Sequence, residues 1–241
     1  MTIDMNCDMG ERADIDEAAL MPWISSANVA CGGHAGDEAM MEHTLELARR
    51  FGVAAGAHPG YPDRANFGRD EMAMRPEDLA SSVFEQIARL DAVASRLGIP
   101  LAHVKPHGAL YNVAVRHSEV AGAIASGVAR WRRDVVLVGL AGSPMLDVWR
   151  AAGFRVASEG FADRAYESDG SLRSRKLPGA LLTDPAEAAG HAWRLAQTGT
   201  MDTLCVHSDT PGAAQIVRAV REGLDRRGVL VRSLTERRRI E

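Results

Sequence analysis

The sequence predicts a parallel β/α barrel with seven or eight strands, a fold of the α/β class. Eight short apolar segments rich in β-branched residues recur along the 241 residues, and most alternate with helical patterns across short connections. Strands joined in this way run parallel, with right-handed crossovers. Seven or eight such units in a chain of this length favour a closed barrel. An open, doubly wound sheet is the alternative.

The predicted elements follow one another in a regular order. Strands are predicted at residues 3–7, 28–31, 53–57, 102–105, 135–138, 155–158, 203–206 and 229–234. The first helix follows Asp37, a residue type that caps helix N-termini, and ends at Gly52. The second begins at Pro76, carries the strongest apolar periodicity of the chain and ends at Gly98. Further helices are predicted at 118–131, at 143–153, from 184 onward and at 210–228, each opened by a serine, aspartate or threonine.

No linker, repeat or low-complexity segment divides the chain, so we predict a single domain spanning residues 1–241. The longest polar segment between predicted elements is 159–178. Long connections in compact domains are commonly functional, and we interpret this one as a lid.

Composition and charge exclude several classes of function. The formal net charge of -4 offers no basic field for nucleic acid. The longest apolar run, around residues 135–140, is too short to cross a bilayer, and the first residues do not resemble a signal peptide. The three cysteines are odd in number and form no CxxC pair, which argues against a disulfide framework. We therefore expect a cytoplasmic protein with neither nucleic-acid nor membrane partners, and a homo-oligomer is compatible with the sequence.

Polar side chains gather at one end of the predicted barrel. Active sites in this fold lie at the carboxyl ends of the strands. The residues that follow successive strands there are Asp8 and Glu11; His34 and Asp37; His58, Asp63 and Arg64; Lys105, His107, Tyr111 and Asn112; Glu159, Asp163, Arg164 and Tyr166; and His207 and Asp209. Four of the eight histidines belong to this set, whereas the opposite end shows nothing comparable. The asymmetry predicts an active or ligand site at this rim.

The glycine-rich stretch at residues 27–37 is typical of an active-site loop. Three glycines within five residues let the backbone turn sharply and approach a ligand closely, and the turn presents His34 and Asp37. The alternative is a tight connecting turn with a surface histidine.

Two kinds of chemistry fit the rim. Asp8, His34 and His58 come from three adjacent strands and suit a divalent metal ion that activates water. The alternative for the same residues is hydrogen bonding and acid–base catalysis. His107 and His207 can move protons near neutral pH, and Lys105 can neutralise a phosphate or carboxylate or form a salt bridge across the barrel mouth. Asp209 fits either the site or the start of a helix.

Only two of the 28 basic residues are lysines, and one of them is Lys105. Retention of a lysine in an arginine-rich chain suggests a position where a compact ammonium is needed. The sequence holds neither a GxxxxGK[ST] phosphate loop nor a GxGxxG fingerprint, so a nucleotide would be held in another way.

Seven segments spread over essentially the whole chain resemble the LamB/YcsF family. They are residues 6–11 (NCDMGE), 26–37 (SANVACGGHAGD), 56–63 (GAHPGYPD), 67–69 (FGR), 103–112 (HVKPHGALYN), 161–166 (FADRAY) and 206–212 (VHSDTPG). The resemblance implies a distorted β/α barrel of the glycoside hydrolase and deacetylase type. It also implies the A subunit of an ATP-dependent 5-oxoprolinase, which acts with B and C subunits and opens 5-oxo-L-proline to L-glutamate while ATP is hydrolysed to ADP and phosphate.

With that reaction in view, we assign catalytic roles to Asp8, His34, Asp37, His58, Lys105, His107, His207 and Asp209. Substrate contacts are assigned to Asn6, Glu11, Asp63, Arg64, Tyr111, Asn112, Asp163, Arg164 and Tyr166, with Arg64, Lys105 or Arg164 balancing phosphate and carboxylate charge. The alternatives are a stand-alone metal-dependent amide or carbohydrate deacetylase and a non-catalytic regulatory subunit that binds a ligand.

Overall fold

Seven parallel strands close into a barrel in the computed structural model, which describes residues 1–168, 170–175 and 177–236. They are β1 (Thr2–Met9), β2 (Ser26–Ala30), β3 (Ala54–His58), β4 (Leu101–Val104), β5 (Val136–Leu140), β6 (Arg155–Phe161) and β7 (Thr203–Cys205). Each strand pairs with the next along the chain, and β1 pairs with both β2 and β7. The predicted closed barrel is therefore confirmed, and the open sheet is excluded because its two edges are joined.

The eighth predicted strand contributes little to the barrel. β8 (Leu230–Val231) is two residues long and pairs in parallel with Thr2 and Ile3 of β1. β7 pairs with the next residues of β1, from Asp4 to Asn6. β8 bonds the backbone of Met1 and Ile3, on the edge of β1 that pairs with β2 and opposite the edge that pairs with β7, so it adds to one end of β1 and the closed barrel has seven strands.

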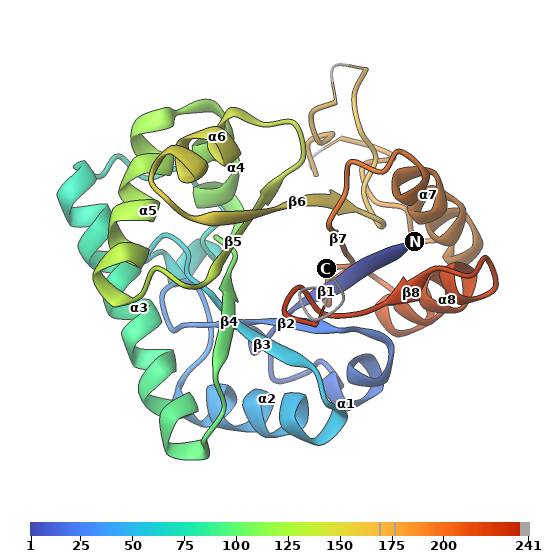
Figure 1. Cartoon of the computed structure of the whole chain (residues 1–241), viewed down its shortest axis with the longest axis horizontal. Coiled ribbons are helices and arrows are strands. Elements are labelled where there is room, and N and C mark those ends of the chain that lie inside the picture. The colour runs from blue at the N-terminus through green and yellow to red at the C-terminus, as the bar shows by residue number, and fades with distance from the viewer. Residues whose placement is uncertain (169, 176, 237–241) are drawn as a thin grey trace.

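Helices surround the barrel on its outer side (Figure 1). The longer ones are α2 (Glu38–Phe51), α3 (Pro76–Leu97), α4 (Gly108–Arg116), α5 (Ser118–Trp131), α6 (Pro144–Ala151), α7 (Pro185–Gln197) and α8 (Ala213–Asp225). The short ones are α1 (Glu17–Leu20) and the 3-10 turns η1 (Met21–Trp23) and η2 (Arg64–Asn66). Among the described residues, no helix combines the length and apolar character that a bilayer crossing requires.

Local signals in the sequence set most helix ends. α2 and α3 end at Gly52 and Gly98, which adopt the left-handed conformation that glycine accommodates without a Cβ clash. The Asp184 side chain caps α7 by accepting a hydrogen bond from the backbone N–H of Glu187 at 2.8 Å. α8 begins at Ala213, three residues later than predicted, because a turn through Gly212 precedes it.

Two apolar regions hold the barrel together. The larger lies between the strands and the helices and includes fully buried Trp149, Met41 and Leu90. The smaller contains Val136, Val138, Ala157 and Leu234. The other strands, by contrast, direct polar side chains inward, which is unusual for a fold whose interior is commonly filled by branched apolar residues.

The segment between β6 and α7 projects from the barrel (Figure 1). Isolated bridges join Arg164 to Leu181 and Tyr166 to Leu172 within it. The predicted lid at 159–178 coincides with most of this segment, although its first three residues belong to β6. Residues 169 and 176 lie outside the described residues.

Candidate functional site

A column of polar side chains fills the barrel interior beneath its carboxyl end. Asp4 accepts hydrogen bonds from the hydroxyls of Ser26 at 2.7 Å and Thr203 at 2.6 Å. One layer higher, the Asn28 amide donates to Asn6 Oδ1 at 2.7 Å and to Asp8 Oδ1 at 2.8 Å. Asp4, Asn6 and Asp8 share one face of β1 because successive strand residues alternate in direction. These bonds satisfy polar groups that would otherwise be costly to bury.

Lys105 lies at the top of this column between two buried carboxylates. Its Nζ is 2.9 Å from Asp8 Oδ1 and 2.8 Å from Glu159 Oε1, and it also donates to Asn6 Oδ1 at 3.1 Å. Although burial lowers the pKa of Lys105, neighbours led by Asp8 raise it well above its usual value. Burial likewise raises the pKa of Asp8, but the charges of His58 and Lys105 hold it well below its usual value. The pair is therefore ionised, and Lys105 is a fixed positive charge at the base of the site.

Three histidines surround the carboxylate of Glu11. Glu11 Oε1 lies 2.9 Å from His34 Nε2, 3.0 Å from His107 Nδ1 and 3.7 Å from His58 Nε2. The rings of His34 and His107 stack with centroids 3.7 Å apart. Burial together with the charge of His107 lowers the pKa of His34 to about 3, whereas Asp8 and Glu11 overcome the burial of His58 and raise its pKa. We name Glu11, His34, His58 and His107 the histidine cluster.

The loop after β3 covers this cluster. The Phe67 ring packs edge-on against the rings of His34 and His107, at centroid distances of 5.7 and 5.5 Å. Phe67 has a φ of 57° and is the only non-glycine described residue with positive φ. A Cβ on the next residue, Gly68, would lie 2.6 Å from His34 Cβ. An aromatic residue in a left-handed conformation is uncommon and concentrates at functional sites, which is consistent with its position here.

A second group of polar side chains comes from the ends of β6 and β7. Nδ1 of His207 donates to Asp163 Oδ1 at 3.0 Å, and Asp163 Oδ2 accepts from the Thr210 hydroxyl at 2.6 Å. The His207 ring stacks on Phe161 with centroids 5.4 Å apart. Because Asp163 holds Nδ1–H, the lone pair of neutral His207 is on Nε2 and is available to accept a proton.

The Asp163 carboxylate gives the fold a measurable acid sensitivity. Burial raises its pKa, but His207 and Thr210 lower it to about 2. A depressed carboxyl pKa stabilises the fold above the unfolded value, and this stabilisation is lost as pH falls towards the folded value. We expect unfolding free energy to fall less between about pH 6 and pH 3 in Asp163→Asn than in the wild type, by about 1 kcal/mol. Urea titrations at both pH values measure this difference, and parallel changes in the two proteins would contradict it.

The structure brings nine of the residues singled out from the sequence together at the barrel's carboxyl end or in its interior. They are Asn6, Asp8, Glu11, His34, His58, Lys105, His107, Asp163 and His207. Tyr111 is also buried, in edge contact with Phe161 at 5.9 Å, and its hydroxyl has no hydrogen-bond partner among the described residues. Asp209 lies at the edge of the site, where it pairs with Arg69 and, at 3.3 Å, with Arg175.

Other predicted site residues hold loops instead. Asp37 caps α2 by accepting from the Met40 N–H at 2.9 Å, and Asp63 caps η2. Arg64 donates to the carbonyls of Gly36 and Gly32, and Arg164 to those of Ala180 and Arg173. The Tyr166 hydroxyl accepts from the Phe161 N–H at 2.8 Å, and Asn112 is exposed on α4. Except for Asn112, these residues therefore have local structural roles: they cap helices or hold loop backbone in place.

The metal-ligand set predicted from the sequence, Asp8, His34 and His58, differs in part from the group of residues that the structure brings together. His34 and His58 lie together as expected, but Glu11 and His107 accompany them. Asp8 is the nearest remaining carboxylate, with Oδ2 3.5 Å from His58 Nε2, and its other oxygen is bonded to Lys105.

Several residues of the site carry no sequence signal at the strand ends. Asn28 and His103 lie within strands and point inward, with His103 Nε2 2.8 Å from Asn28 Oδ1. Polar residues at alternate positions of otherwise apolar strands are the pattern that could have identified them. Glu159, which the sequence predicted to follow a strand, also lies within one. Arg69 and Arg175 reach the site from loops, where the spacing of residues in the sequence does not predict the direction of a side chain.

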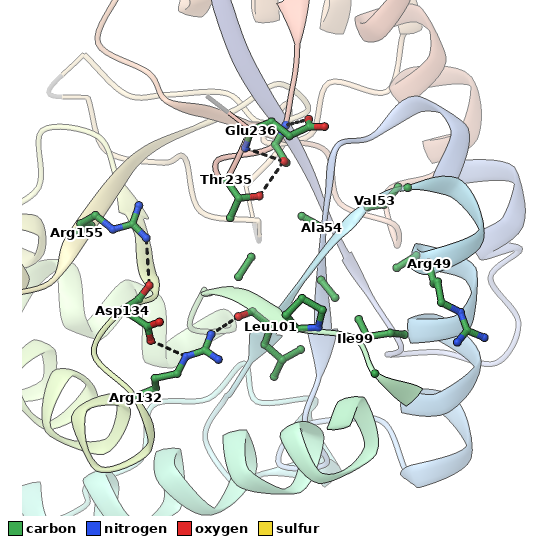
Figure 2. Close-up of a pocket in the computed structure, with 17 residues that line it drawn as sticks. Arg49, Val53, Ala54, Ile99, Leu101, Arg132, Asp134, Arg155, Thr235 and Glu236 are labelled. Carbon is green, nitrogen blue, oxygen red and sulfur yellow. Dashed lines mark hydrogen bonds and ion pairs between the residues drawn. The ribbon is translucent and has the colours of Figure 1, made fainter. Parts of the chain in front are cut away.

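A pocket of about 570 Å³ opens at the opposite end of the barrel (Figure 2). Arg132, Asp134 and Arg155 line one side, and Thr235 and Glu236 lie near the strands on another (Figure 2). Arg132 pairs with Asp134 at 2.7 Å. Among the described residues that line this pocket, none is a histidine or a cysteine, so the acid–base groups lie at the other end.

Comparison with known proteins gives consistent matches. The model of the LamB/YcsF family matches residues 3–239. A protein of Chloroflexus aggregans named as the A subunit of 5-oxoprolinase is 46% identical over 249 aligned residues, which cover 97% of this chain and 99% of that protein. A relative with the same name from Heliobacterium modesticaldum is 45% identical and covered completely, with 98% of this chain aligned.

Solved structures agree at the level of the fold. The lactam utilization protein from Thermus thermophilus superposes with a TM-score of 0.92 at 43% identity, covering 97% of this chain and 100% of that one. The catalytic domain of a peptidoglycan N-acetylglucosamine deacetylase from Eubacterium rectale gives a TM-score of 0.54 at 10% identity over 97% of this chain and 89% of that one. At that identity the second likeness concerns the fold alone.

Proposed function

Because the chain belongs to the LamB/YcsF family, we propose that it is the A subunit of an ATP-dependent 5-oxoprolinase. The reaction opens the lactam of 5-oxo-L-proline to L-glutamate and releases ADP and phosphate. Relatives of near-equal length that are named as the A subunit of 5-oxoprolinase support the assignment, as does the structural likeness to a protein named for lactam utilization. Their name also supports a complex of several subunits, for which we propose B and C subunits as partners.

The observation that carries the proposal is the meeting of acid–base groups at one end of the barrel. The Asp163–His207 pair, the Asp8–Lys105 pair and the histidine cluster all lie there, and His58 Nε2 is 3.5 Å from Asp8. Lactam hydrolysis needs a base for water, an acid for the ring nitrogen and positive charge for the carbonyl oxygen. This set of side chains can supply all three.

The lactam carbonyl is a poor electrophile, and phosphorylation would activate it. In the proposed sequence its oxygen attacks the γ-phosphorus of ATP, the bond to the β–γ bridging oxygen breaks, and ADP leaves. Water then adds to the activated carbon while His207 Nε2 takes up the water's proton and passes it to the ring nitrogen. Cleavage of the ring C–N bond leaves an acyl phosphate, and a second water releases phosphate and completes glutamate.

Charge at the entrance is suited to anionic substrates. Arg69 and Arg175 both contact Asp209, and each retains donors that can meet a carboxylate or phosphate. We assign them the charge-balancing role that the sequence suggested for Arg64 and Arg164, since the latter two are bonded to backbone carbonyls. Lys105 supplies the remaining positive charge deeper in the site.

Reconstitution tests the proposed function. We expect this chain, mixed with purified B and C subunits, ATP and 5-oxoproline, to form glutamate and ADP in equal amounts, and we expect no glutamate when this chain is omitted. Enzymatic assays of both products give the ratio. Binding of 5-oxoproline to the complete complex without turnover would contradict a catalytic role and support a regulatory one.

The histidine cluster favours one second candidate, a metal-dependent amide hydrolase that works without ATP. The reconstitution separates the two, because glutamate release that continues without ATP and without B and C subunits would support the second candidate. Glutamate release that requires ATP would exclude it.

A further inference from the structure

We propose that Glu11, His34, His58 and His107 form a binding site for one divalent transition-metal ion of the zinc class. The inference goes beyond the proposed function and does not depend on 5-oxoproline being the substrate. It rests on the spacing of four donor atoms, the direction of their lone pairs and their burial.

The spacing of the donor atoms fits tetrahedral coordination. Bonds of about 2.0–2.1 Å to zinc place the ligand atoms of a tetrahedral site about 3.3–3.4 Å apart. Here Glu11 Oε1 is 2.9, 3.0 and 3.7 Å from the facing nitrogens of His34, His107 and His58, and His107 Nδ1 is 3.0 Å from His58 Nε2. All four donor atoms lie within 4.8 Å of one another. A single ion can reach all four once the rings of His34 and His107, which lie stacked and parallel, tilt towards it.

Backbone carbonyls fix the direction of two lone pairs. His58 Nδ1 is 2.7 Å from the carbonyl oxygen of Lys105, and His107 Nε2 is 2.9 Å from that of Phe67. Because a carbonyl oxygen only accepts, both of these nitrogens carry hydrogen. The lone pairs of neutral His58 and His107 consequently face each other and Glu11. Metal-ligating histidines are held in this way, by donating the other ring N–H to an acceptor.

Two facing lone pairs 3.0 Å apart require something positive between them. A proton on His58 is one occupant, because it would bond to His107. In that arrangement His34 binds separately, by donating its Nε2–H to Glu11 Oε1 at 2.9 Å. A metal ion accounts for all four donors together.

Burial and donor type narrow the class of ion. The side chains of Glu11, His34, His58 and His107 are 4%, 0%, 1% and 7% exposed, so the site is shielded from bulk water. Three imidazole nitrogens and one carboxylate oxygen suit zinc and neighbouring transition metals, whereas magnesium and calcium prefer oxygen ligands. The ion would link the carboxyl end of β3 to the loops that follow β1, β2 and β4.

Metal analysis of the untagged full chain tests the proposal. After removal of metal with a chelator, we expect one equivalent of Zn²⁺ to bind, and Co²⁺ to give the visible absorption bands of a tetrahedral site. Glu11→Gln and His107→Gln should each weaken Zn²⁺ binding by more than about 100-fold. Such a loss of affinity exceeds the one expected when a residue that only hydrogen-bonds to a metal ligand is replaced.

His207→Gln is the matched control. Asp8, Cys205 and His207 form a second group of donors within 4.8 Å, so a site there would lose its metal in this variant. We expect His207→Gln to keep one equivalent. Circular dichroism and thermal unfolding identify variants that fail to fold, and either ligand variant suffices if the other misfolds. No stoichiometric metal in the folded wild type, metal retained by folded ligand variants, or metal lost in His207→Gln would each overturn the proposal.

Discussion

Replacing Lys105 with methionine is expected to abolish 5-oxoprolinase turnover and to lower the free energy of unfolding by about 3–5 kcal/mol, the cost of breaking a buried ion pair. The Lys105 ammonium lies 2.9 Å from Asp8 and 2.8 Å from Glu159, and both carboxylates are buried. Methionine has a similar shape but no charge, so two negative groups would face each other without a cation. The loss should far exceed that from an exposed arginine such as Arg75, whose ion pairs are screened by water.

Urea unfolding and the reconstituted assay measure the two effects. The double variant Lys105→Met/Glu159→Gln separates them, since it removes one of the uncompensated carboxylates. We expect it to regain part of the lost stability but none of the activity. Single and double variants of equal stability would contradict the pairing, and a stable, active Lys105→Met would contradict both the structural and the catalytic role.

Replacing His207 with glutamine is expected to lower kcat in the reconstituted complex by about 10²–10⁴-fold, the usual contribution of a general acid–base group. Glutamine preserves a polar side chain of comparable reach but cannot cycle a proton. Because His207 lies at the site's partly exposed edge, stability should change by less than in Lys105→Met. Asp163→Asn should also lower kcat: the amide oxygen is needed by the His207 backbone N–H and the Thr210 hydroxyl, so the NH2 group faces His207 Nδ1 and holds the wrong tautomer.

The double variant Asp163→Asn/His207→Gln and a control variant test whether the two residues act together. If Asp163 acts through His207, the double variant should be little worse than His207→Gln alone. His191→Gln is the matched control, since His191 is a partly buried histidine on α7 outside the site, and it should keep wild-type kcat. Additive losses from Asp163 and His207, or an equal loss in His191→Gln, would contradict the assigned roles.

Local signals make much of the fold predictable. Pro76 and Gly98 delimit α3 to the residue, because a proline in the first turn and a left-handed glycine act on their own neighbours. α4 is not predictable in this way, because it starts at Gly108, directly after the loop that carries His107, and no capping side chain marks its start. The extent of β8 cannot be measured from the sequence, since its two-residue length depends on pairing with the distant β1.

The site is predictable where topology alone places the residue. His34, His58, His107 and His207 follow strands that the barrel brings to one end, so their proximity follows from the fold class. Sequence cannot distinguish Arg64, which bonds backbone carbonyls, from Arg69, which reaches Asp209. That difference depends on loop conformation, including the left-handed Phe67 between them.

The double pairing of β1 also sets the order in which the molecule can be completed during synthesis. β1 can pair with β2 soon after both are synthesised. Its other edge pairs with β7, which begins only at Thr203. At about 5–20 residues per second, roughly 10–40 s of translation separate the two pairings. Until then the first strand exposes an unpaired edge to the nascent chain's surroundings, the kind of edge that recruits other strands. The bond between Asp4 and the Thr203 hydroxyl forms only when the last third of the chain closes that edge.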